Sequence, residues 1–171
     1  MASDFPVTFR MLHSMSNERN KFIDLLIKLP QEEFFRRVRP DRATLAEAIM
    51  MTVGHDMACL QALEMKSEIV LPGPEAFPNH IALINGLIHV ENEKVKLLKR
   101  MSDSDLDLEL NIQSTESPHR RGRVRDMVER LIDISLPHTV ALGNAIIALG
   151  HREELEKAMG MFKAPKPEEF N

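Results

Sequence analysis

The chain has 171 residues, a length that suits one domain built around one hydrophobic core. Its 43% hydrophobic and 28% charged residues are typical of a soluble globular protein, and a net charge of −4 argues against general nucleic-acid binding, which needs a basic face. A single cysteine excludes an internal disulfide and fits a reducing, cytoplasmic location. We therefore expect one domain over residues 1–171, with a flexible tail over 163–171.

The spacing of apolar residues predicts an all-α protein. Apolar positions recur every three or four residues through most of the chain, whereas the two-residue alternation of strands is nearly absent. No apolar run approaches the roughly 20 residues that a membrane-spanning helix needs, so we expect no membrane partner. The predicted helices cover residues 8–29, 44–65, 79–101 and 123–149, followed by a short helix over 152–159.

Local signals support these helix boundaries. Thr44 and Glu47 have the spacing of a capping box at the start of the second helix, and Gly150 is placed to cap the end of the fourth. Pro137 lies inside the fourth helix and is expected to kink it. Residues 102–122 form an unusually long connection, with one short strand predicted over 108–112, and such a connection could cover a site.

Two histidines mark the candidate site. His55 and His138 each occupy a core-facing position where a packed helix would normally carry Leu or Ala. Neutral imidazole is the commonest metal ligand in proteins, and sites in helical bundles are built from facing helices. The alternative is that each is a satisfied core or interface residue without a ligand.

Two further residues could add ligands to these histidines. Cys59 lies one turn after His55, so the pair could chelate a soft ion, or Cys59 could be a small buried side chain. Glu91 lies in the middle of the apolar stripe of the third helix and needs a partner. It could be a metal ligand, an acceptor for a histidine N–H, or an ion-pair partner of Arg19, and we prefer the ion pair.

A basic segment precedes the fourth helix. Arg120, Arg121 and Arg123 stand close together where a helix N-terminus would also favour an anion. They could bind an anionic cosubstrate, or they could simply be solvated loop residues.

The layout as a whole resembles the DinB/YfiT-like superfamily of four-helix bundles. The resemblance rests on the order of several segments: a histidine near the middle of the second helix, Met-Ser-Asp-Ser-Asp-Leu-Asp at 101–107, the helix that carries His138, and a small-residue segment ending at Gly150. It implies an up-down-down-up bundle, frequently a homodimer, to which the short C-terminal helix predicted above is added. It also implies a divalent metal, often zinc or nickel, and thiol-dependent transferase activity.

The metal motif is incomplete in this chain. The resemblance implies a ligand one turn after His138, where the sequence has Leu142. Two hypotheses follow. The protein is a descendant that binds a small ligand or partner, in a pocket that Met51 would help to line. Alternatively, it is a divalent-metal-dependent enzyme of the thiol-transferase type, with a small-molecule or thiol ligand.

Overall fold

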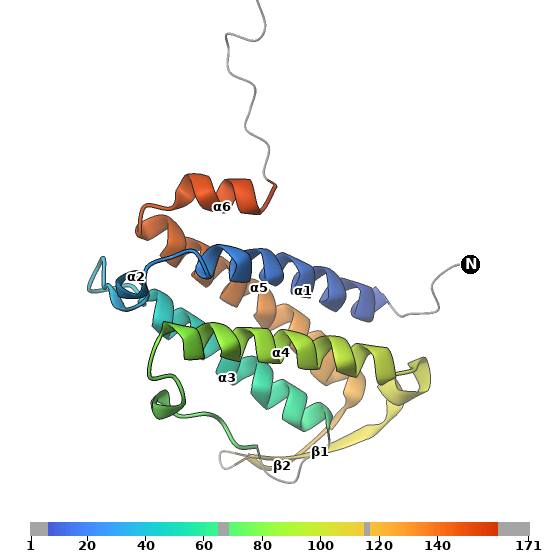
Figure 1. Cartoon of the computed structure of the whole chain (residues 1–171). Coiled ribbons are helices and arrows are strands. Elements are labelled where there is room, and N and C mark those ends of the chain that lie inside the picture. The colour runs from blue at the N-terminus through green and yellow to red at the C-terminus, as the bar shows by residue number, and fades with distance from the viewer. Residues whose placement is uncertain (1–6, 65–68, 115–116, 161–171) are drawn as a thin grey trace, which may run out of the picture.

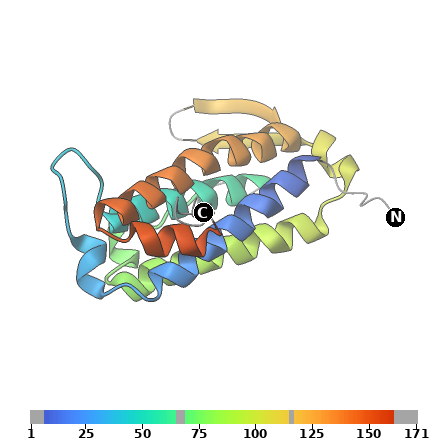
Figure 2. The same cartoon turned by 90° about the horizontal axis from the view of Figure 1, so that it is seen from above.

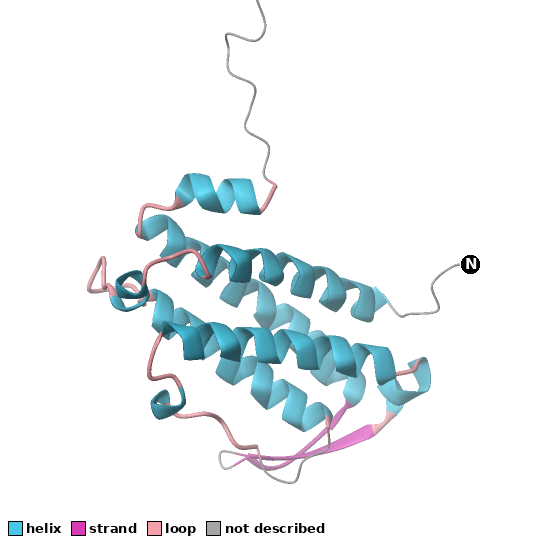
Figure 3. Cartoon of the chain, in the orientation of Figure 1, coloured by secondary structure: helices cyan, strands magenta, loops and turns pink. Residues whose placement is uncertain are grey.

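The computed structural model describes residues 7–64, 69–114 and 117–160. Helix is the dominant secondary structure there (Figure 3), which confirms the predicted all-α class. The four long helices are α1 (Val7–Leu26), α3 (Leu45–Leu63), α4 (His80–Arg100) and α5 (Val124–Ala148). The short elements are α2 (Gln31–Phe35), α6 (Arg152–Ala158), the 3-10 turns Pro74–Ala76 and Asp103–Asp107, and the strands β1 (Glu109–Ser114) and β2 (Ser117–Arg123).

The four long helices pack side by side in a closed ring (Figures 1 and 2). α1 contacts α4 and α5, and α3 contacts the same two helices from the other side. α6 packs on α1 and α5, while α2 packs on α3. Every long helix therefore buries one face against two neighbours, which is the arrangement that a three-and-four spacing of apolar residues predicts.

The predicted caps are present. The backbone N–H of Glu47 donates to Thr44 Oγ1 at 3.1 Å, and that of Thr44 donates to Glu47 Oε2 at 2.8 Å, so both halves of the capping box form. Gly150 has a φ of 100°, the left-handed conformation expected just after a helix end. Pro137 lies inside α5, which continues through it.

The connection between α4 and α5 differs from its prediction. One strand was expected, but β1 pairs antiparallel with a second strand, β2, in a hairpin. β2 reads Ser-Pro-His-Arg-Arg-Gly-Arg, which has no apolar residue to reveal a strand. The hairpin is anchored by β1 instead, where Leu110 is buried in the core.

α5 bears on the question of a membrane. Among the described helices, α5 alone is long and apolar enough to cross a bilayer by length and composition. The sequence analysis did not predict such a helix. Only 31% of its most apolar window is buried inside the structure. Length and composition are weak evidence, since core helices of soluble proteins pass the same test, and the expected absence of a membrane partner stays a prediction.

Alanine substitutions at Gly54 and Gly150 are expected to change the free energy of unfolding in opposite directions. A Cβ added to Gly54, in the middle of α3, would meet no atom within 4 Å. Gly54→Ala is therefore expected to raise the free energy of unfolding by about 0.5–1 kcal/mol, because glycine is a poor helix former. Gly150→Ala is expected to lower it by about 1–2 kcal/mol, because an alanine disfavours a positive φ. Urea denaturation measures both, and a Gly54→Ala variant less stable than wild type would contradict the prediction.

Candidate polar site between four helices

The core consists of two apolar clusters, one toward each end of the long helices. On α1, α4 and α5, polar side chains separate the residues of one cluster from those of the other, whereas on α3 Leu60 of the first cluster lies beyond Asp56, next to Cys59 of the second. Apolar packing is thus interrupted by a polar layer near the middle of the long helices. This polar layer contains Ser16 and Arg19 from α1, His55 and Asp56 from α3, Glu91 and Lys94 from α4, and His138 from α5.

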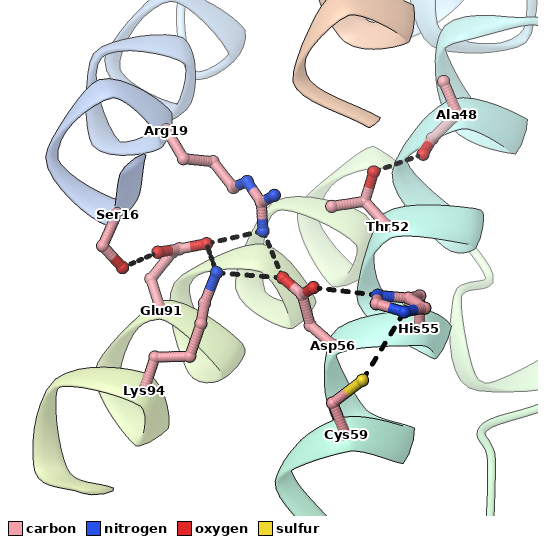
Figure 4. A network of polar contacts seen from close by, with 9 residues as sticks. All are labelled: Ser16, Arg19, Ala48, Thr52, His55, Asp56, Cys59, Glu91 and Lys94. Carbon is pink, nitrogen blue, oxygen red and sulfur yellow. Dashed lines mark hydrogen bonds and ion pairs between the residues drawn. The ribbon is translucent and has the colours of Figure 1, made fainter. Parts of the chain in front are cut away.

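Four charged side chains of the layer form a buried ion-pair network (Figure 4). Arg19 contacts Asp56, and its Nη1 lies 3.0 Å from Glu91 Oε1. Lys94 Nζ lies 3.0 Å from Asp56 Oδ2 and 2.6 Å from Glu91 Oε1. Ser16 donates a hydrogen bond to the other Glu91 oxygen. The four charged side chains are at most 2% exposed, and their two positive and two negative charges cancel.

The network holds Asp56 in its charged form. Burial alone would raise the pKa of this carboxyl. The hydrogen bond from His55 and the positive charges of Lys94 and Arg19 outweigh burial and lower the pKa well below its usual value. Asp56 is therefore a carboxylate at neutral pH, and one of its oxygens faces a histidine.

His55 and His138 come together between α3 and α5. Their ring centroids are 5.1 Å apart and the ring planes are inclined by 79°, so one imidazole presents its edge to the other. His55 Nδ1 lies 3.4 Å from Asp56 Oδ1, within reach of a hydrogen bond in which an N–H on Nδ1 donates to the carboxylate. A carboxylate beside Nδ1 favours the neutral tautomer that carries its proton on Nδ1, which leaves a lone pair on Nε2.

His138 is the less satisfied of the two. Its Nδ1 is buried and has no hydrogen-bond partner among the residues that the structure describes. Burial lowers the pKa of His138, and the nearby His55 lowers it further. His138 is therefore neutral at pH 7, the form in which imidazole binds metals or accepts a hydrogen bond.

The titration of His138 should show this environment. We expect a pKa below the ordinary value of about 6.5 when its ring protons are followed by NMR. In His55→Gln the pKa should rise but stay below that value, because burial is the larger cause. The folded-state pKa is the lower one, so this residue's contribution to stability is complete above about pH 6.5 and is lost as the pH falls. A pKa above the value measured in the urea-unfolded chain would contradict the assignment.

Cys59 lies next to His55 but is not reactive as it stands. Its Sγ is 3.5 Å from His55 Nε2, and the side chain is buried. Burial, with a smaller contribution from the charge of Asp56, raises the pKa of the thiol to about 12. The thiol is thus protonated at neutral pH and serves as a weak donor to His55 rather than as a nucleophile.

Two other predicted site residues, Leu142 and Met51, lie in contrasting surroundings. Leu142 is fully buried in the apolar cluster nearest the end of α5, and Met51 is 59% exposed on α3. Over residues 7–64, 69–114 and 117–160, no group of three or more His, Cys, Asp or Glu side chains is placed to hold a metal ion. Within the described residues, the site thus consists of two histidines and a nearby thiol, while the adjacent carboxylate of Asp56 is engaged by Arg19 and Lys94.

Of the three roles considered for Glu91, the structure has the ion pair with Arg19. Sequence reasoning missed Lys94 and Ser16, which also bind Glu91. Lys94 follows Glu91 by three residues on the same helix, a spacing that brings side chains together and could have revealed the pair.

The basic segment before α5 is only partly described. Arg120 and Arg121 belong to β2, and their side chains lie outside the described residues. Arg123 is 63% exposed and lies 4.0 Å from Asp107, which is also 3.6 Å from Arg125. The carboxylate of Asp126 accepts the N–H of Arg123 at 3.0 Å. Acidic side chains of the chain itself therefore accompany the described part of this segment.

The described residues line at least two hollows on the surface, and neither of these two includes Met51, His55 or His138. The first, which we term the α1–α4 groove, has a volume of about 550 Å³ and is lined by Arg10, His13, Ser14, Asn17, Val95, Leu98 and Lys99. The second, of about 540 Å³, lies between the segment that follows α2 and the last turns of α5. Both volumes fall in the range of small-molecule sites.

Comparison with known proteins gives no match, since no family model, no curated protein and no solved structure is similar to this chain. The resemblance to the DinB/YfiT-like superfamily consequently rests on the residues and their order alone.

Proposed function

We propose that this protein is a ligand-binding helical bundle of the DinB/YfiT-like type in which the catalytic metal site is incomplete. The proposal rests on the number of metal ligands that the polar layer supplies. His55 and His138 meet, but the position one turn after His138 belongs to Leu142, whose side chain packs in the apolar core. A catalytic zinc site needs three protein ligands and one open position, and the histidines provide two.

The remaining acidic groups of the layer do not compensate for the missing ligand. Asp56 and Glu91 are both engaged by Arg19 and Lys94, so recruiting either would leave buried cations without a partner. Cys59 holds its proton at neutral pH. A thiol transferase of this type would use its metal ion to ionise the thiol cosubstrate. Two histidines without a further free ligand would bind such an ion weakly.

The proposed up-down-down-up topology is supported by the chain direction in Figure 1. α3 and α4 both run from the end of the molecule near α2 toward the opposite end, and α1 and α5 run the other way. The closed ring of helix contacts is consistent with the same order.

Zinc and nickel titrations test the proposal. A complete structural zinc site contributes about 10–16 kcal/mol, so two of four ligands correspond to an affinity of about micromolar or weaker. We expect that weak binding in the wild-type chain, with His138→Ala abolishing it and no thiol transfer to an electrophile in the presence of either metal. Stoichiometric nanomolar binding accompanied by thiol transfer would overturn the proposal.

One observation favours the alternative, a metal-dependent enzyme. His55 Nε2 and Cys59 Sγ are 3.5 Å apart. A tetrahedral ion with zinc–nitrogen and zinc–sulfur bonds of about 2.1 and 2.3 Å would hold these atoms about 3.6 Å apart. His138 would then be the third ligand, and Asp56 would orient His55. Cobalt distinguishes the two proposals: an intense cobalt–thiolate absorption that disappears in Cys59→Ala would establish the alternative, and its absence would support the first.

A further inference from the structure

The α1–α4 groove has a composition that a solvated surface does not explain. α1 supplies Arg10, His13 and Asn17 at intervals of three and four residues, so these polar side chains share one face, and that face is turned toward α4. α4 supplies Val95 and Leu98, whose side chains give the groove an apolar floor. None of the described residues that line the groove is acidic, although acidic residues outnumber basic ones in the chain by 26 to 22.

The two cations of the groove have no acidic partner within residues 7–64, 69–114 and 117–160. Neither Arg10 nor Lys99 takes part in any ion pair of the described residues. Arginines that line the second hollow are different: Arg36 pairs with Glu33, and both Arg39 and Arg42 approach Asp41. Of these two hollows, the α1–α4 groove is thus the one whose described cations lack an ion pair and lie over an apolar floor.

Helix stability does not account for Arg10. It stands in the first turn of α1, which contains no acidic residue. The positive end of the helix macrodipole favours acidic side chains there and disfavours cations. A cation in this unfavourable position, with no ion pair among the described residues, suggests that Arg10 serves ligand binding rather than the stability of the fold.

We propose that the α1–α4 groove binds a free anionic amphiphile, a small molecule with a carboxylate or phosphate head and an apolar body. The head lies over Arg10 and Lys99, where charge-assisted hydrogen bonds can form, and the body lies against Val95 and Leu98. The volume of about 550 Å³ accommodates a molecule of this kind. The inference rests on the ligand-binding role proposed above, and it adds the site and the class of ligand.

Calorimetric titration of the full chain with decanoate tests the assignment. We expect one molecule bound per chain, with decanol, which has the same apolar body and no charge, binding at least tenfold more weakly. The double variant Arg10→Gln/Lys99→Gln should lose at least tenfold in decanoate affinity while its melting temperature, followed by circular dichroism, does not fall. The matched control Lys28→Gln/Lys157→Gln removes two exposed cations outside the groove and should bind as wild type does.

Three results would overturn the proposal: equal affinity for decanoate and decanol, an equal loss in the control double variant, or binding only to vesicles of anionic phospholipid and not to monomeric decanoate. Val95→Asp provides a second test that leaves both cations in place, and it should also weaken decanoate binding at least tenfold. Zinc titration of the same samples separates the two proposals. Absence of decanoate binding with weak zinc binding removes only the groove assignment, whereas tight zinc binding with thiol transfer removes the proposed function.

Discussion

Replacing Asp56 with alanine is expected to lower the free energy of unfolding by about 3–5 kcal/mol. Asp56 is fully buried and contacts both Arg19 and Lys94. Its removal takes away one of the two carboxylates that these cations contact in the described part of the chain, so positive charge in the protein interior loses compensation. Removing one member of a buried ion pair costs far more than the pair contributes relative to an apolar replacement, because the remaining charge stays desolvated.

The chain offers a matched control for this measurement. Asp133 also lies in the middle of a long helix, but it is exposed, and Asp133→Ala should change stability by no more than about 0.5 kcal/mol. Unfolding in urea must be followed by circular dichroism, because the chain has neither Trp nor Tyr as a fluorescent probe. Asp56→Ala and Asp133→Ala with equal stabilities would show that the ion-pair network does not form.

The same network predicts how stability depends on acid. The pKa of Asp56 is lowered in the folded state, whereas in the unfolded chain it should be near 3.9. The stabilisation is therefore complete above about pH 4 and is lost as the pH falls below it toward the folded-state pKa. In Asp56→Asn the decline below about pH 4 should be shallower than in wild type. An identical acid limb in the two proteins would contradict the assigned direction of the pKa shift.

A buried ion-pair network is weak evidence for a stabilising role. Replacing all members of such a network by apolar residues of similar volume is often neutral or stabilising. What this network does provide is a fixed carboxylate beside His55, which selects the tautomer of that ring. We infer that the network positions the His55–His138 pair, which links the polar layer to the candidate site rather than to the strength of the core.

The sequence predicted the long helices because their apolar spacing and their caps agree. Thr44, Glu47 and Gly150 each have one physical role that local sequence defines, and the structure contains all three. β2 could not be predicted in this way, since its strand conformation comes from pairing with β1 rather than from its own residues. α2 is only five residues long, too short for a periodic pattern, and it is held by the burial of Phe34.

Residues of the candidate site could be predicted only where a polar side chain stands in the apolar stripe of a helix. His55, Glu91 and His138 interrupt apolar stripes, so each could be singled out before the structure was known. Arg19 was predicted as the partner of Glu91, and the three-residue spacing could have revealed Lys94. The contacts of both cations with Asp56 required three-dimensional placement, because they span 37 and 38 positions of the chain. The α1–α4 groove was missed altogether, since Arg10 and Lys99 look like ordinary surface residues until the two helices are packed together.

Leu142→His is expected to have the second large effect, and it tests whether position 142 is a metal-ligand position that this chain has lost. Leu142 is completely buried among apolar side chains. Replacing it by histidine removes core packing and buries a polar ring, so we expect a loss of about 2–5 kcal/mol in the free energy of unfolding. If position 142 is the lost ligand position, zinc at about 100 times its dissociation constant should restore roughly 2.7 kcal/mol.

Two further variants make the result interpretable. Leu142→Gln should lose a similar amount of stability and gain nothing from zinc, because an amide is a poor zinc ligand. Leu142→His/His138→Ala should also lose the zinc response, since the two positions lie one helical turn apart and would bind the ion together. Zinc stabilisation of Leu142→His alone would place a third ligand beside the His55–His138 pair. If zinc has no effect on it, position 142 does not face the pair, and the resemblance to a three-ligand metal site fails even though the helical fold remains.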